Sequence, residues 1–309
     1  MTEENDTLVT EIILVGLSYY PETQTAFFWA VLIVYIITLI GNSLIVMLIV
    51  VDRQLHTPMY FFLSNLSFVD ICYSSSCAPQ VLVRGFAKKA TISLNSCLAQ
   101  GYVSIFLGIT ECLLLAVMAY DRFVAICNPL QYSLIMSGKV CTQLAAFSWV
   151  SALLLTMIRE SVQPKHFCRN VINHFMCELQ AVLKLACSHT SFSQLVNLAT
   201  ALLALVAPFI FIVVTYVLIG QVVLHTCSAQ GRNKALSTCS SHLAVVSIFY
   251  GTAMSMYVRP QSKSFSDKDK LISMFYVFIT PVLNPLIYSL RNKDVQGALK
   301  RTIMRRVLH

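Results

Sequence analysis

The stretch Met-Ala-Tyr-Asp-Arg-Phe-Val-Ala-Ile-Cys, residues 118–127, places an acid beside a base at the end of a run of roughly twenty apolar residues. A charge in hydrocarbon is costly, so the pair Asp121–Arg122 at this position needs an explanation. One interpretation is an arginine that snorkels to the surface where a helix leaves the membrane. The other is a lock at a helix end, which opens when a cytoplasmic partner binds. The stretch alone favours neither.

The composition of the whole chain indicates an integral membrane protein. Of 309 residues, 57% are hydrophobic and 12% are charged, with a mean hydropathy of +0.70, whereas soluble domains carry about 25% charged residues. The formal net charge of +8 arises in the connections and the tail, so we expect attraction to anionic lipid and no nucleic acid. The first twenty residues contain no Lys or Arg and no compact apolar segment with a cleavage site, so we expect the first apolar run to direct insertion.

Seven apolar runs are long enough to span a membrane as helices. We therefore predict an all-α membrane protein, a seven-transmembrane helix bundle, as a single domain over residues 1–309. Residues 1–24 precede the bundle, 25–290 form it, and 291–309 are a tail. The sixth run is the weakest, because its first half is polar. The predicted spans are Thr25–Val51, Met59–Val83, Cys97–Cys127, Val140–Ile158, Leu195–Leu224, Ala235–Val258 and Leu271–Leu290.

The orientation of the chain cannot be taken from its basic residues, since eleven Lys and Arg fall on each side. Three other features place the amino terminus outside. The segment before the first span has no Lys or Arg, and Asn5-Asp6-Thr7 is a glycosylation sequon that is used only on the lumenal side. The cysteine-rich connection after the fourth span suits an oxidising compartment.

The tail has the pattern of a helix that lies on the inner membrane surface. Val295, Leu299, Ile303 and Val307 recur every four residues, with basic residues between them. A frayed tail is the alternative.

Four cysteines fall on the outer side of the predicted bundle. Cys168, Cys177 and Cys187 lie in the long connection after the fourth span, and Cys97 begins the third span. Four cysteines allow three pairings. We favour Cys97–Cys177, which would hold the connection over the bundle as a lid, with Cys168–Cys187 closing the connection on itself. One or more free thiols remain the alternative.

Two carboxylates stand mid-span, Asp70 in the second run and Glu111 in the third. Each should face the bundle interior, where a shared proton or a bound monovalent cation would offset their charge. Asn284 in the seventh run could supply a further oxygen. The alternative is a pair of protonated structural carboxyls. Neither the spacing nor the neighbouring residues fit a zinc site or a hydrolytic centre.

Two further patterns concern the bundle interior. The seventh run contains Asn284-Pro285-Leu286-Ile287-Tyr288, whose proline permits a bend, unless it is an ordinary membrane-helix proline. A mostly apolar pocket is indicated by two stripes at helical spacing, although such stripes also serve helix packing. They comprise Ser104, Ile105, Gly108, Ile109 and Cys112 in the third run, and Tyr250 and Tyr257 in the sixth.

At four places the chain resembles vertebrate olfactory receptors. The motifs are Met-Ala-Tyr-Asp-Arg-Phe-Val-Ala-Ile-Cys (118–127), Leu-His-Thr-Pro-Met-Tyr-Phe-Phe-Leu (55–63), Lys-Ala-Leu-Ser-Thr-Cys-Ser-Ser-His-Leu (234–243) and Pro-Val-Leu-Asn-Pro-Leu-Ile-Tyr-Ser-Leu-Arg-Asn (281–292). With Gly41-Asn42 and the three-cysteine connection, the resemblance covers the chain nearly end to end.

The resemblance implies a rhodopsin-like receptor of the plasma membrane that binds a small odorant and raises cAMP through a stimulatory G protein of the olfactory type. It implies no enzymatic activity and no cofactor beyond a sodium ion. The roles that it implies concern four groups of residues: Arg122, held by Asp121 and released to engage the G protein beside Tyr216 and Tyr288; Asn284 and Pro285 in the bend; Asp70 and Glu111 around sodium; and Tyr250 and Tyr257 at the odorant.

The chain departs from the family pattern in a few positions. Phe123 and Leu236 replace the commoner Tyr and Phe, and Glu178 and Gln180 stand where Asp and Pro are more usual. The sixth run also lacks the Cys-Trp-x-Pro element of most rhodopsin-like receptors, so a switch mechanism of amine receptors does not transfer.

Rival classes fit less well. A secondary transporter would show internal repeats and more spans. An intramembrane enzyme would need a nucleophile and base or metal ligands at membrane depth, and His242 has no acidic residue in its own run. An amine receptor would carry an acid where this chain has Ser104.

Overall fold

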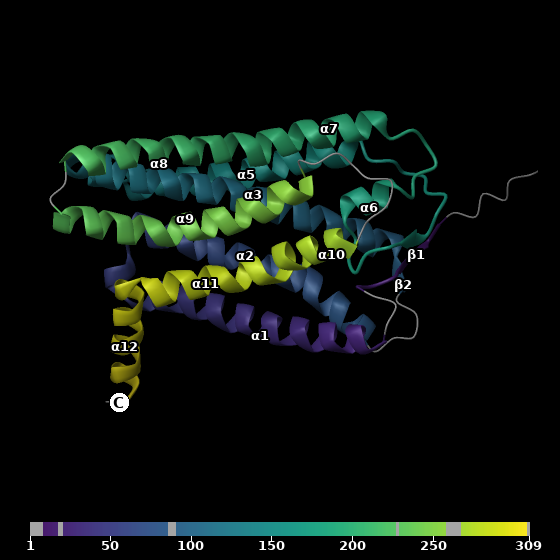
Figure 1. Cartoon of the computed structure of the whole chain (residues 1–309), viewed down its shortest axis with the longest axis horizontal. Coiled ribbons are helices and arrows are strands. Elements are labelled where there is room, and N and C mark those ends of the chain that lie inside the picture. Colours follow the sequence, from purple (N-terminus) through teal and green to yellow (C-terminus); the bar gives the residue numbers. More distant parts are fainter. Residues whose placement is uncertain (1–8, 18–20, 86–90, 227–228, 258–266, 308–309) are drawn as a thin grey trace, which may run out of the picture.

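The computed structural model describes residues 9–17, 21–85, 91–226, 229–257 and 267–307. Within these ranges seven long helical segments pack side by side, which confirms the predicted bundle (Figure 1). The segments are α1 (Pro21–Val51), α2 (Pro58–Gly85), α3 (Leu94–Cys127), α5 (Gly138–Ser161), α7 (Ser191–Ala201) continued by α8 (Ala207–Thr226), α9 (Ala229–Tyr257), and α10 (Asp267–Met274) continued by α11 (Thr280–Arg291).

The tail forms helix α12 (Lys293–Val307), which leaves the end of α11 and runs roughly at right angles to the long helices in Figure 1. Its apolar face is docked, since Val295 and Ala298 are buried while Lys300 is exposed. The Arg301 guanidinium forms an ion pair with Asp52, with 2.7 Å between Nη2 and Oδ2. The tail is therefore an ordered amphipathic helix. We call this end of the bundle the α12 end.

A small sheet at the opposite end was not predicted. Strand β1 (Glu11–Leu14) lies between β2 (Thr91–Ser93), to which it is antiparallel, and β3 (Val171–Ile172), to which it is parallel. Alternation turns Ile12 and Leu14 inward, where both are buried. We call this the sheet end. The sheet joins the chain before α1, the connection before α3, and the connection between α5 and α7 (residues 162–190, the lid).

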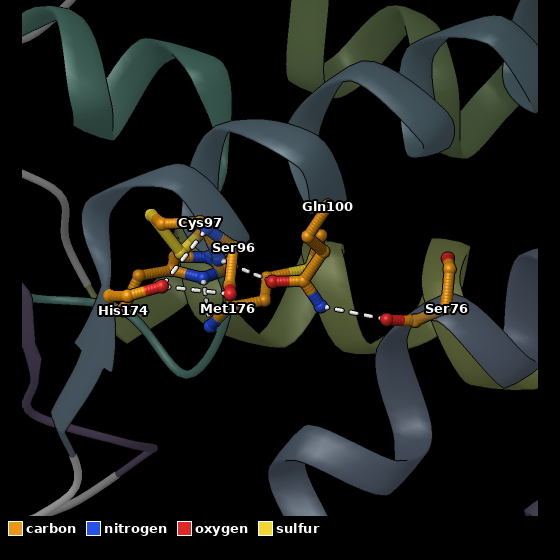
Figure 2. Close-up of a disulfide and its surroundings, with 8 residues drawn as sticks. Ser76, Ser96, Cys97, Gln100, His174 and Met176 are labelled. Carbon is orange, nitrogen blue, oxygen red and sulfur yellow. Dashed lines mark hydrogen bonds between the residues drawn. A yellow bond between two sulfur atoms is a disulfide. The ribbon is translucent and has the colours of Figure 1, made fainter.

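Both predicted disulfides are present and hold the lid. Cys97 of α3 bonds to Cys177, and Cys168 bonds to Cys187, with Cα–Cα distances of 5.3 and 5.0 Å. Gln100, one turn after Cys97, strengthens this attachment: its Oε1 accepts a hydrogen bond from the Cys177 amide, and its Nε2 donates to the Ser76 carbonyl of α2 (Figure 2). The lid is thereby fixed to two helices of the bundle.

Two of the seven helices, α2 and α9, are more polar than most membrane-spanning helices. Among the described residues, length and apolar composition alone identify five spans, which leaves out α2 and α9. The reason is their buried polar residues, which are Ser67, Asp70 and Ser74 in α2 and Ser241 and His242 in α9. Such helices are stable in a membrane because other helices cover their polar faces. The sequence pattern anticipated this for α9.

Two π-helical segments interrupt the helices on one side of the bundle. Leu202–Val206 joins α7 to α8, and Phe275–Ile279 joins α10 to α11. Each ends two residues before a proline, Pro208 or Pro281. A proline ring clashes with the carbonyl four residues earlier, and the wider π turn relieves that clash.

The extra residue of the first π segment changes the buried face of the helix. Two helical turns lead from buried Asn197 to buried Ala204, and two more would lead to Phe211. Phe211 is 44% exposed instead, and Ile212 is buried at 1%. The face has therefore moved by one residue.

Candidate functional site

All five residues of the predicted α3 stripe line one cavity in the half of the bundle towards the sheet. Ser104, Ile105, Gly108, Ile109 and Cys112 form its α3 wall. The cavity holds about 50 Å³. The other walls come from four more of the seven long helices. Their lining residues are Arg159 of the fourth (α5), Thr200, Ala201, Ala204 and Leu205 of the fifth (α7 and the first π segment), Ala253 of the sixth (α9) and Tyr276 of the seventh (the second π segment).

Gly108 allows Tyr276 to close the cavity. A Cβ atom built on Gly108 would lie 2.7 Å from the Tyr276 hydroxyl oxygen, closer than any ordinary contact. The tyrosine ring also packs edge-on against Tyr73 of α2, with ring centroids 5.7 Å apart. The absence of a side chain at residue 108 therefore sets the width of the cavity.

Tyr250 lies behind the cavity wall. Its hydroxyl donates a hydrogen bond of 3.1 Å to the Cys112 carbonyl, and its ring packs against Phe209. In the described structure Tyr250 is not part of the lining, so its contact with a ligand stays a prediction. The side chain of Tyr257 lies outside the described residues, and so does Asn5.

The lid is anchored above the bundle by a buried histidine. His174 is fully buried, its Nδ1 accepts from the Met176 amide, and its Nε2 lies 3.1 Å from the Ser273 hydroxyl of α10. This arrangement suits a neutral ring with its proton on Nε2. Burial, and then the positive charge of Lys270, lower the pKa of His174 to about 3. The Glu178 carboxylate, 3.4 Å from Nε2, acts in the opposite direction, but burial outweighs it.

The two mid-span carboxylates meet at the seventh helix, as predicted. The Asn284 amide donates to both Asp70 oxygens, at 3.2 and 3.0 Å, and to Glu111 at 3.4 Å. All three side chains are buried. No cluster of three or more His, Cys, Asp or Glu residues suited to a metal occurs in the described part of the chain. The two carboxylates offer oxygen ligands of the kind that hard cations require. Asn284 presents its NH2 group to them, and not the further oxygen that the sequence suggested.

Asp121 is held by a residue that the sequence did not single out. The Tyr132 hydroxyl, from the short helix α4 (Tyr132–Ile135), donates a hydrogen bond of 2.7 Å to Asp121 Oδ1. Burial, and then the Asp121 charge, raise the pKa of Tyr132, so the hydroxyl stays a donor. Within the described ranges, Asp121 and Arg122 form no direct ion pair. Successive helical residues point in different directions, which accounts for this.

Several polar groups gather around Arg122 at the α12 end. Tyr216 of α8 and His242 of α9 share a hydrogen bond of 2.7 Å between the hydroxyl and Nδ1. Among the described residues, Arg122 Nη2, His242 Nε2 and the Tyr288 hydroxyl are buried without a hydrogen-bond partner. Buried polar groups are costly in that state. The end therefore offers hydrogen-bonding capacity to a binding partner or to a rearranged packing.

The proline-containing part of the seventh helix lies against the first. Asn42 of α1 donates to the Pro281 carbonyl at 3.0 Å. A Cβ on Gly41 would lie 3.2 Å from the Pro285 ring, so these helices touch closely there. The Gly41-Asn42 pair thus positions the segment that carries Asn284.

Sequence reasoning missed three residues that the structure places at these sites. Arg159 was counted only as an outer basic residue, although its spacing from Thr156 and Ala152 put it on the inward face of its helix. Tyr276 belonged to neither of the two stripes at helical spacing that the sequence showed. Tyr132 lies in a connection, where no helical pattern could link it to Asp121.

Known proteins match the chain along nearly its full length. The sequence model of the olfactory receptor family matches residues 31–306. The chain is 50% identical to human olfactory receptor 13H1 over 307 residues, covering 99% of this chain and 100% of the relative. It is 45% identical to mouse olfactory receptor 1E16 over 308 residues, covering 99% and 98%.

The fold also matches a solved structure. Squid rhodopsin superposes with a TM-score of 0.73 over 94% of this chain and 88% of that chain, at 18% identity, which bears on the fold alone. Olfactory receptors are multi-pass signalling receptors of the plasma membrane that respond to small molecules and act through G proteins, and they are not enzymes. With its sequence matched by the family model and by relatives up to 50% identical, this chain belongs to the olfactory receptor family.

Proposed function

We propose that this receptor binds small, mostly hydrophobic volatile ligands in the cavity beside α3 and activates a stimulatory G protein of the olfactory type, which raises cAMP. The observation that carries the proposal is the cavity itself. It is mostly apolar, it lies under a disulfide-anchored lid, and its walls come from five separate helical segments. A ligand there touches each segment that must move for the bundle to repack.

In this proposal the sheet end and the amino terminus face the outside, with Asn5 glycosylated, and α12 lies against the inner leaflet. The two disulfides of the lid support this orientation, because disulfides persist in oxidising compartments. The basic residues of α12 support it as well, since the inner leaflet carries the anionic lipid.

Ligand binding and G-protein coupling would be linked by a shift between two packings of the bundle. The ligand touches α9 at Ala253, and the same helix carries His242 at its other end, bonded to Tyr216. A packing that separates α9 from α8 would break this bond and open the α12 end. Arg122 and Tyr288, whose polar atoms are buried there, would then engage the G protein and each other.

The pair Asp70 and Glu111 would hold a proton or a sodium ion in the resting packing. Two ionised carboxylates that meet one amide in a buried site repel each other, so a positive charge or a proton must compensate them. Asn284 and the adjacent Pro285 lie inside α11, and a change of bend at this proline would alter the separation of these oxygens.

The test is a cAMP assay in cells that express the receptor, with a chemically diverse odorant panel and surface labelling. The wild-type receptor should respond to at least one compound, and Arg122→Ala should reach the surface yet give no response. Arg53→Ala removes an exposed arginine from the same end and should respond normally. A normal response from Arg122→Ala would contradict the coupling role, and a receptor that raises no cAMP with any compound would contradict the proposed function.

A further inference from the structure

We propose that Arg159 makes the cavity selective for short-chain monocarboxylates, whose carboxylate it binds. The inference rests on the proposed function, because it names the ligand class of the same cavity. Among the described residues that line the cavity, Arg159 is the only charged one.

The position of Arg159 on its helix directs it inward. Ala152, Thr156 and Arg159 are buried and follow one another at spacings of four and three residues, which place them on one face of α5. The neighbours Ile158 and Glu160 are exposed. Arg159 is only 7% exposed, so its charge is not carried to the surface of the bundle as that of a snorkelling arginine would be.

The helix end that carries Arg159 is held in place. Gln163 Nε2 donates to the Arg159 carbonyl at 2.8 Å and to Asn197 Oδ1 at 3.2 Å, which ties α5 to α7. Ser193 of α7 donates to the Val162 carbonyl. These bonds fix the backbone from which the Arg159 side chain projects, so the helix end need not be ordered when a ligand binds, which lowers the entropic cost of binding.

The hydroxyl groups of Thr200 and Ser104, which also line the cavity, have partners within the protein. The Thr200 hydroxyl donates to carbonyls of its own helix, at Val196 and Asn197. The Ser104 hydroxyl contacts the Cys77 thiol at 3.6 Å. Arg159 is the one cation among the described residues of the wall, and the planar fork of a guanidinium matches the two oxygens of a carboxylate. An ammonium ligand would be repelled.

The volume of the cavity and its apolar lining residues indicate the length and polarity of the ligand beyond its carboxylate. Cys112, Ala204, Leu205 and Ala253 offer an apolar surface for a hydrocarbon chain. The cavity of about 50 Å³ is a third of the roughly 150 Å³ of an engineered cavity that binds benzene. Only a few carbon atoms fit before Tyr276 or the π segments must move. Glu160, the acid next in sequence, lines a separate cavity under the lid.

The test compares four compounds of equal chain length in the cAMP assay: butanoic acid, methyl butanoate, butan-1-ol and butylamine. Butanoic acid should be the most potent at the wild-type receptor and butylamine inactive. Arg159→Gln should raise the half-maximal concentration of butanoic acid about 10- to 100-fold and leave the ester and alcohol nearly unchanged, the loss expected for a charge-assisted bond. Arg159→Lys should retain part of the acid response.

A matched control and a second readout make the result decisive. Arg169→Gln removes an equal charge from an exposed site on the lid and should leave the acid response unchanged. Butanoate should also raise the unfolding temperature of the purified wild-type receptor and not that of Arg159→Gln, a measurement that needs no G protein. If Arg159→Gln does not fold, the role of Arg159 is judged from the response of Arg159→Lys to butanoic acid and from the potencies of the four compounds at the wild-type receptor.

Equal potency of acid and ester at the wild type, or an equal shift of both in Arg159→Gln, would overturn the inference while leaving odorant reception intact. If no compound of any class raises cAMP, the proposed function fails instead, and the thermal shift with butanoate still confirms or refutes the role of Arg159.

Discussion

Acidification should destabilise this receptor through His174, the buried histidine of the lid. In the folded protein burial and Lys270 hold its pKa at about 3, whereas the ordinary value is 6.5. Its Nδ1 accepts the Met176 amide and its Nε2 contacts Ser273, so a second proton on the ring would break one of these bonds. The unfolded chain has no such restriction.

The sign and size follow from proton linkage. Below pH 6.5 the unfolded state takes up a proton that the folded state refuses, so the stability that His174 contributes is complete above pH 6.5 and is lost as the pH falls towards 3. At about pH 5.5, one unit below the unfolded pKa, the loss is about 1.4 kcal/mol. With an unfolding entropy of about 2.1 cal/mol/K per residue, this lowers the unfolding temperature by about 2 °C.

The assay is thermal unfolding of the purified receptor at about pH 7.5 and about pH 5.5, a range that stays above the ordinary carboxylate pKa values. His174→Gln removes the titrating ring and keeps an amide that can reach Ser273. Its unfolding temperature should fall less between the two pH values than that of the wild type. His166→Gln alters an exposed histidine of the same lid and should keep the wild-type difference.

Equal pH differences in the wild type and His174→Gln would refute the reasoning. Such a result would mean that the folded ring takes up its proton at the same pKa as the unfolded ring. A larger pH difference in His174→Gln would refute the reasoning as well, because it would mean that the pKa of the folded ring is raised, with the charge held by Glu178.

Three further predictions concern the cavity, the lock and the lid. Gly108→Val should raise the half-maximal concentration of any agonist by about tenfold or more, because its side chain displaces Tyr276 from contact; a cAMP dose–response curve measures this, and Gly251→Val, where an added Cβ meets nothing within 4 Å, is the control. Tyr132→Phe should lower the free energy of unfolding by about 1.5–3 kcal/mol, since it removes the bond to buried Asp121; an unchanged unfolding temperature would contradict this. Mild reduction of the two lid disulfides should abolish the agonist response, because each such crosslink contributes about 2–5 kcal/mol to a small domain; a response that survives complete reduction, checked by thiol labelling, would show that the lid holds without them.

The sequence alone predicted the elements whose signals are periodic or local. Apolar runs located the seven helices to within a few residues, and the four outer cysteines yielded the pairing that the structure has. The α3 stripe was visible because helical spacing puts its members on one face, and that face lines the cavity. Asp70, Glu111 and Asn284 could be brought together because a buried charge requires a partner.

The sequence did not predict contacts between segments that show no common periodic pattern. The sheet pairs strands of two to four residues, which are too short to show alternation. Tyr132 meets Asp121 across a turn, and His174 meets Ser273 across 99 residues. Such pairs depend on how the lid and the connections fold back, and a single chain offers no local signal for that.

Each of the two π segments divides its helix into two halves. The residues that face inward in one half are set independently of those that face inward in the other. Thr200, in the upper half of the helix that carries Leu202–Val206, and Ala204, within this segment, line the cavity. Tyr216 in the lower half is bonded to His242 of α9. Because one surplus residue separates the halves, the side chains of the upper half do not dictate which side chains of the lower half face inward. Substitutions beside the cavity can thus accumulate in the upper half without changing which side chains of the lower half face α9. The shape of the cavity and the packing at the α12 end can therefore change independently along one continuous helix.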